Sequence, residues 1–65
     1  MQVIINGATR TTQQTYLMQL LQELEIDPRR IAVELNMNIL PKAEYETTPL
    51  NEGDAIEIVH FVGGG

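Results

Sequence analysis

The sequence contains no cysteine, and it has few basic residues, with four lysines and arginines against nine aspartates and glutamates. Without cysteine the chain has no disulfide framework, no thiol nucleophile, no cysteine metal ligand and no side chain suited to holding a persulfide. The formal net charge of -5 at pH 7 argues against nucleic acid as a partner, because phosphates require a basic face.

Long hydrophobic runs are also missing. No apolar stretch approaches the roughly 20 residues of a membrane span, and no segment resembles a signal peptide. We therefore expect a cytoplasmic protein with no membrane partner. At 65 residues the chain forms one small domain, and a domain of this size buries only about 60% of its unfolded surface. Such a core favours a binding or carrier module over an enzyme with its own deep pocket.

The acidic residues are concentrated in the second half of the chain. After Arg30 the only lysine or arginine is Lys42, and it is set against Glu34, Glu44, Glu46, Glu52, Asp54 and Glu57. Long-range attraction of a basic partner surface is one interpretation. An acidic surface that only keeps a small protein soluble is the other.

The first half predicts a hairpin and a helix. Residues 1–5 are apolar and β-branched, as in a strand, and Asn6-Gly7 is the strongest short signal for a two-residue hairpin turn. Thr15 is the expected helix N-cap. An amphipathic helix of about three turns should end before Asp27-Pro28, because apolar residues recur with helical spacing at Leu17, Leu20, Leu21 and Leu24.

The second half predicts three further strands. Residues 31–35 are the third strand, residues 36–38 a tight turn and residues 39–40 a short fourth strand. A single helical turn is expected at residues 42–45, and the last strand starts at residue 55 and reaches the glycines at residues 63–65. The helix must bury its leucines on one face of the sheet, and the last strand is expected beside the first. This order predicts an α+β, ubiquitin-like β-grasp with a mixed sheet of four to five strands over residues 1–62.

The last three residues of the sequence are Gly63-Gly64-Gly65. Glycine offers no side chain to pack and is costly to order, so we expect a flexible tail over residues 63–65. Such a tail is thin enough to enter a narrow active site on another protein. The terminal carboxylate of Gly65 is then the working group.

The chain resembles the ThiS family, small sulfur carriers of the ubiquitin-like superfamily. The resemblance rests on the opening Met1-Gln2-Val3-Ile4-Ile5-Asn6-Gly7, on Ile39-Leu40-Pro41-Lys42, and above all on the ending Gly53-Asp54-Ala55-Ile56-Glu57-Ile58-Val59-His60-Phe61-Val62-Gly63-Gly64-Gly65. It implies a function in the formation of the thiazole of thiamine. The MoaD-like carriers of molybdopterin synthesis share the fold and a Gly-Gly end, and they are the nearest alternative.

The resemblance implies a chemistry for the tail. A ThiF-like adenylyltransferase joins the Gly65 carboxylate to AMP, using ATP and magnesium bound by that partner. A cysteine-persulfide donor then displaces AMP, and the resulting Gly65 thiocarboxylate gives its sulfur to a ThiG-like thiazole synthase. Gly63 and Gly64 thread into the partner. In this interpretation the chain is a cosubstrate with no catalytic residue, cofactor or metal of its own.

Strand alternation predicts a docking patch beside the tail. If Ile56 and Ile58 face the core, Val59 and Phe61 face outward, and by the same parity so does Ile4. Exposed apolar patches often mark interfaces, although a covering loop or a bulge would remove this one.

Two other functions remain open from the sequence. The chain could be a ubiquitin-like modifier joined to lysines through the same carboxyl, or an interaction module with an inert tail. Other candidate sites are weaker: His60 has no second histidine or cysteine beside it in the sequence, and Asp54 follows Gly53, where aspartate commonly accepts from turn backbone.

Overall fold

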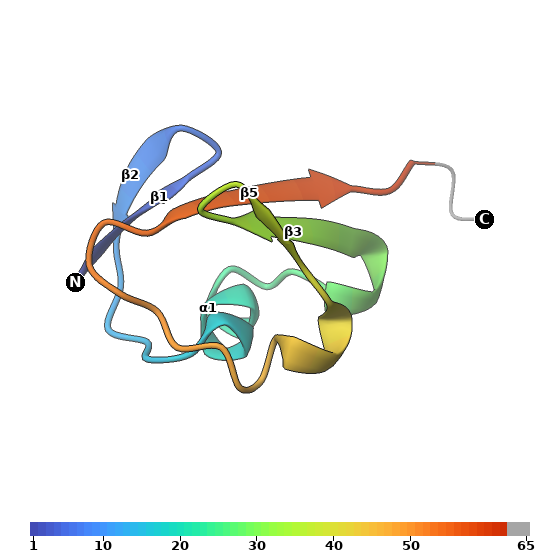
Figure 1. Cartoon of the computed structure of the whole chain (residues 1–65), viewed down its shortest axis with the longest axis horizontal. Coiled ribbons are helices and arrows are strands. Elements are labelled where there is room, and N and C mark those ends of the chain that lie inside the picture. Colours follow the sequence, from blue (N-terminus) through green and yellow to red (C-terminus); the bar gives the residue numbers. More distant parts are fainter. Residues whose placement is uncertain (63–65) are drawn as a thin grey trace.

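A computed structural model describes residues 1–62 of the chain. It contains strands β1 (Gln2–Ile5), β2 (Ala8–Thr11), β3 (Ile31–Leu35), β4 (Asn38–Leu40) and β5 (Ala55–His60), the helix α1 (Leu17–Glu23), and two 3₁₀ turns, η1 (Pro28–Arg30) and η2 (Lys42–Glu44). The strands form one sheet in the order β2-β1-β5-β3-β4. β1 and β5 are parallel, and the other neighbours are antiparallel. The predicted β-grasp with a mixed sheet is confirmed, and β5 is its central strand (Figure 1).

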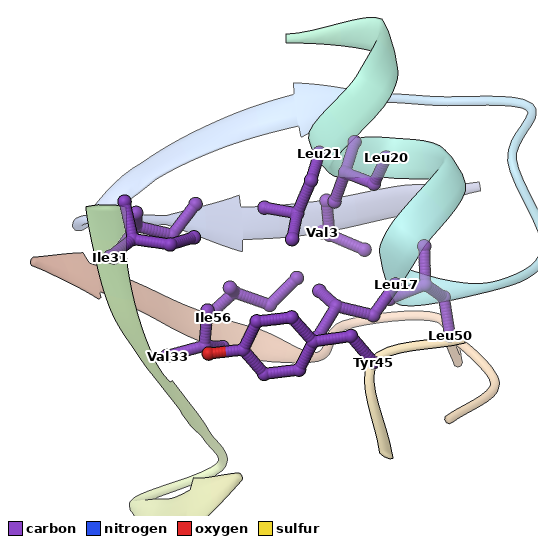
Figure 2. Packing of buried hydrophobic residues seen from close by; sticks show 10 residues of the cluster. Val3, Leu17, Leu20, Leu21, Ile31, Val33, Tyr45, Leu50 and Ile56 are labelled. Atoms are coloured by element: carbon purple, nitrogen blue, oxygen red, sulfur yellow. The ribbon is translucent and has the colours of Figure 1, made fainter. Parts of the chain in front are cut away.

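The core lies between α1 and one face of the sheet. Figure 2 shows leucines of α1 pointing toward apolar side chains of β1, β3 and β5, with the Tyr45 ring beside Val33 and Ile56. The buried cluster consists of Val3, Leu17, Leu20, Leu21, Ile31, Val33, Tyr45, Leu50, Ile56 and Ile58. The predicted helical stripe is therefore confirmed at three of its leucines, while Leu24 is only partly buried.

The helix is shorter than the sequence predicts, at seven residues. Its N-cap is Tyr16, because Gln19 folds back and its Oε1 accepts hydrogen bonds from the backbone N–H groups of Thr15 and Tyr16, each at 3.1 Å. At the other end Glu25 adopts a left-handed conformation (φ 58°) and the Ile26 amide donates to a carbonyl of the last helical turn. This Schellman-type ending stops the helix before Pro28 is reached.

Two hairpins share the same turn geometry. Asn6 and Gly7 have φ values of 49° and 83°, and Asn36 and Met37 have φ values of 51° and 72°. Two consecutive positive φ values are the mark of the type I′ turn, whose twist matches that of the flanking strands. The turn predicted at Asn6-Gly7 is confirmed. The turn predicted over residues 36–38 is present but is two residues long, because Asn38 already belongs to β4, and Met37 occupies a position that usually favours glycine.

Candidate functional site

The outer face of the sheet, opposite α1, carries the predicted patch residues. Ile4, Val59 and Phe61 are exposed by 37%, 58% and 58%, respectively. The predicted parity holds, because Ile56 and Ile58 are exposed by only 1% and 6%. No segment within residues 1–62 buries Val59 or Phe61.

The register separates Ile4 from the other two patch residues. Ile4 lies opposite Ala55 on β5, and Val59 is four residues further along that strand. At about 3.3 Å per residue the two positions are roughly 13 Å apart. The Glu57 position lies between them, so the structure brings Val59 and Phe61 together but not Ile4 with Val59.

Two carboxylates lie side by side on this outer face. Glu57 on β5 is the direct partner of Glu34 on the antiparallel strand β3, and both side chains are exposed. Like charges directly opposite each other across two strands destabilise the pair. Ile39 of β4 lies on the other side of Glu34 and is 80% exposed. The centre of the face therefore combines apolar side chains with two adjacent negative charges.

The asparagines of the two hairpin turns fasten β5 in place. The Asn6 side chain accepts a hydrogen bond from the Ile58 amide at 2.7 Å and donates one to the Ile58 carbonyl at 3.2 Å. On the other side Asn36 accepts from the Ala55 amide at 2.9 Å through its Oδ1. These side chains continue the sheet where β1 and β3 turn away. The turn preference of asparagine was visible in the sequence, but its bonds to β5 were not.

Asp54 serves the turn before β5, as the sequence predicts. Its Oδ2 accepts from the Asn51 amide at 2.8 Å, and its Oδ1 accepts from the Asn36 side chain at 3.0 Å. The side chain is buried, and its acceptors are used within the fold. Within residues 1–62, no three histidine, aspartate or glutamate side chains lie together as a metal site requires.

The end of β5 is held by segments that precede β3 and follow β4. The Phe61 amide donates to the Arg30 carbonyl at 2.8 Å. The Lys42 ammonium lies 5.3 Å from the centroid of the Phe61 ring and donates to the Arg29 carbonyl at 3.0 Å. These contacts, which we call the Phe61 clasp, join Arg29, Arg30, Lys42 and Phe61. The sequence did not predict the Phe61 clasp, because its members come from three separate parts of the chain.

Asp27 organises the charges beside the clasp. Its carboxylate lies 2.9 Å from the Arg29 guanidinium and 3.6 Å from that of Arg30. The hydrogen bonds from the Arg29 side chain and backbone lower the pKa of Asp27 to about 2. Three of the four lysines and arginines, Arg29, Arg30 and Lys42, thus gather where the chain leaves β5, in an otherwise acidic protein.

A shallow hollow lies on the α1 side of the domain. It measures about 510 Å³ and is lined by Tyr16, Met18, Gln19, Gln22, Pro28 and Glu46. No histidine, serine, threonine or lysine among residues 1–62 lines it. In the part of the chain that the structure describes, no helix has the length and apolarity to cross a bilayer.

The predicted reactive group and thread, Gly65 with Gly63 and Gly64, lie outside the described residues. The structure therefore describes the face of the sheet and the Phe61 clasp that lead to them. Chemically, the described part offers an exposed apolar and acidic face and a fixed exit point for the chain.

Comparisons with known proteins agree on one family. The model of the ThiS family matches residues 3–65. The sulfur carrier protein ThiS of Bacillus subtilis is 41% identical over 49 residues, covering 75% of this chain and 74% of that protein. The crystal structure of the thiamine biosynthesis protein ThiS from Geobacter metallireducens superimposes with a TM-score of 0.85 at 30% identity, covering 100% of both chains.

A longer protein also contains a region similar to this chain. A thiazole synthase of Paramagnetospirillum magneticum is 44% identical over 66 residues, which cover 100% of this chain but 20% of that enzyme. The chain thus spans about a fifth of the length of that relative.

Proposed function

The chain belongs to the ThiS family, the sulfur carriers of thiamine biosynthesis, and from this premise we propose that it carries sulfur as a thiocarboxylate on Gly65. The observation that carries the proposal is the family match itself, because it runs from residue 3 through residue 65 and includes the three glycines. In this function the protein is a cosubstrate. The reactions are catalysed by its partners.

The proposed chemistry first makes the carboxylate electrophilic. Its negative charge repels nucleophiles, and oxide is a poor leaving group. On a ThiF-like adenylyltransferase, which binds ATP and magnesium, a Gly65 carboxylate oxygen attacks the α-phosphorus of ATP and pyrophosphate leaves. The terminal sulfur of a cysteine persulfide then attacks the carbonyl carbon, and AMP leaves with the oxygen. The product is an acyl disulfide, which keeps the S–S bond of the persulfide. A second thiol attacks the donor cysteine sulfur of that bond, forming a disulfide with it and releasing the Gly65 thiocarboxylate.

The proposed sulfur acceptor is a ThiG-like thiazole synthase. A thiazole synthase that contains a region similar to the whole of this chain supports this partner, because a carrier domain linked covalently to a synthase delivers its cargo at high effective concentration. We assign the chemistry to the cytoplasm, where ATP and reduced thiols are available.

The outer face is the proposed docking surface for these partners. Val59 on β5 and Phe61, just after the end of β5, are the last exposed apolar side chains before Val62 and the tail. Contact at these residues places the tail beside the partner, and the glycines offer no side chain that could clash with a narrow channel. Ile4 contributes at the other end of the same face.

Intact-mass measurement tests the proposal. The intact mass of the protein isolated from its natural source is measured first, to establish that Gly65 carries the free carboxyl. The chain is then incubated with ATP, magnesium, a ThiF-like enzyme and a persulfide donor. We expect a mass gain equal to the exchange of one oxygen for sulfur, located on Gly65 by fragmentation.

Two variants complete the test. Deletion of Gly65 is expected to abolish the gain while leaving the unfolding transition unchanged, and Glu46→Gln, on the α1 side, is expected to retain it. Adducts linked to lysines would instead identify a protein modifier. An unmodified wild-type chain with an active adenylyltransferase would contradict the proposal.

A further inference from the structure

The exit point of the tail is fixed by few contacts. The last pair of the β3–β5 ladder is Ile31 with His60, and the Phe61 amide adds one further backbone bond, to Arg30. Val62 is 97% exposed, so it adds no burial. The direction in which the chain leaves the sheet is therefore decided at Phe61.

The Phe61 ring is held although it is more than half exposed. The Lys42 ammonium lies over the ring at 5.3 Å, within the range of about 6 Å at which a cation is attracted to an aromatic face. The same ammonium donates to the Arg29 carbonyl at 3.0 Å. The Lys42 side chain thus links the ring to η1. The carbonyl of Arg30, the last residue of η1, accepts the hydrogen bond from the Phe61 amide.

From these contacts we propose that Lys42 is a positioning residue, which fixes the ring and backbone of Phe61 and so aims the tail at the active site of the activating enzyme. The proposal rests on the function proposed above. An activated group reacts at a rate that depends on the fraction of time it spends in a reactive geometry. Lys42 holds Phe61, two residues before the tail begins, and so acts on the direction in which the chain approaches the partner.

A purely stabilising function does not fit the position of Lys42. Its side chain is exposed, and it lies outside the buried cluster. Its contacts are with the Arg29 carbonyl and the Phe61 ring, both at the exit of the chain. Loss of the ammonium is therefore expected to leave the core unchanged.

The test compares Lys42→Met with Lys42→Arg and with Arg10→Met. Methionine keeps an unbranched apolar side chain but removes the cation, whereas arginine restores a cation that stacks on aromatic rings. Arg10 is paired with Glu23 at 3.4 Å on β2, so its replacement removes the same charge away from the clasp. The readouts are backbone ¹⁵N order parameters of Phe61 and Val62, the thermal midpoint, and the kcat/KM of the activating enzyme for each variant.

We expect Lys42→Met to lower both order parameters and to reduce kcat/KM by about two- to fivefold, the range for an exposed cation over an aromatic ring. Lys42→Arg should restore the order parameters and kcat/KM. Arg10→Met should leave the order parameters and kcat/KM unchanged. In Phe61→Leu, where the ring is absent, Lys42→Met should lower the Val62 order parameter by less than it does in the wild type.

Two results would overturn the proposal: unchanged order parameters in Lys42→Met, or no restoration by Lys42→Arg. The relaxation data also separate the positioning of the tail from the sulfur-carrier function. If no chain is sulfurated at all, the function fails, while the order parameters still decide whether Lys42 fixes the exit.

Discussion

The two faces of β5 use one alternating pattern for opposite purposes. Ile56 and Ile58 on the inner face are almost completely buried, whereas Val59 on the outer face is 58% exposed. All three are β-branched and apolar, so their burial is not a matter of side-chain type. It depends on α1, which covers one face of the sheet and leaves the other open. The inner face stabilises the domain, and the outer face is available to the proposed partners.

The largest expected effect comes from shortening an inner-face isoleucine. Ile56→Ala should lower the free energy of unfolding by about 2–5 kcal/mol, because it removes buried carbon and leaves a cavity. Ile39→Ala is the matched control, since Ile39 is 80% exposed on the outer face. It should cost less than about 0.5 kcal/mol. Urea denaturation of both variants checks this, and equal losses would contradict the difference between the faces.

The next comparison places one substitution on each face. Val33→Thr should cost about 1–3 kcal/mol, because it buries a hydroxyl in the core. Val59→Thr keeps the same shape on the exposed face, so its unfolding free energy should stay close to that of the wild type. Its KM with the adenylyltransferase should nevertheless rise if Val59 docks there. An unchanged KM would remove Val59 from the proposed docking surface.

The smallest expected effect concerns the charges of the outer face. Glu57→Gln removes one of two carboxylates that oppose each other across β5 and β3. It should stabilise the domain by roughly 0.3 kcal/mol at low ionic strength, and the gain should shrink as salt is added. Glu46→Gln changes the net charge equally but lies on the α1 side, in the lining of the hollow. Thermal unfolding at two salt concentrations should therefore show no gain for that control.

Local patterns in the sequence determined most of the fold. Alternation predicted which residues of β5 face the core, and Asn6-Gly7 predicted the first hairpin. The leucine spacing predicted the buried side of the helix. Each of these features depends on residues that are close together in the sequence. Their physical cause is therefore contained in the local sequence. The predicted helix length was wrong, because Gln19 and Glu25 determine where the helix begins and ends. They do so through side-chain and backbone conformations that the composition does not specify.

Tertiary structure alone decided which distant residues meet at the exit of the chain. The Asn6 side chain bonds to Ile58, 52 residues away, and Lys42 reaches Phe61 only because β3, β4 and β5 lie side by side. Such contacts depend on strand order and register, which follow from burying the whole apolar face at once and not from any local spacing. The sequence alone therefore determined the β-grasp and the glycine ending that resembles a sulfur carrier. The folded sheet decided how Phe61 is held, and it placed Glu57 between Ile4 and Val59.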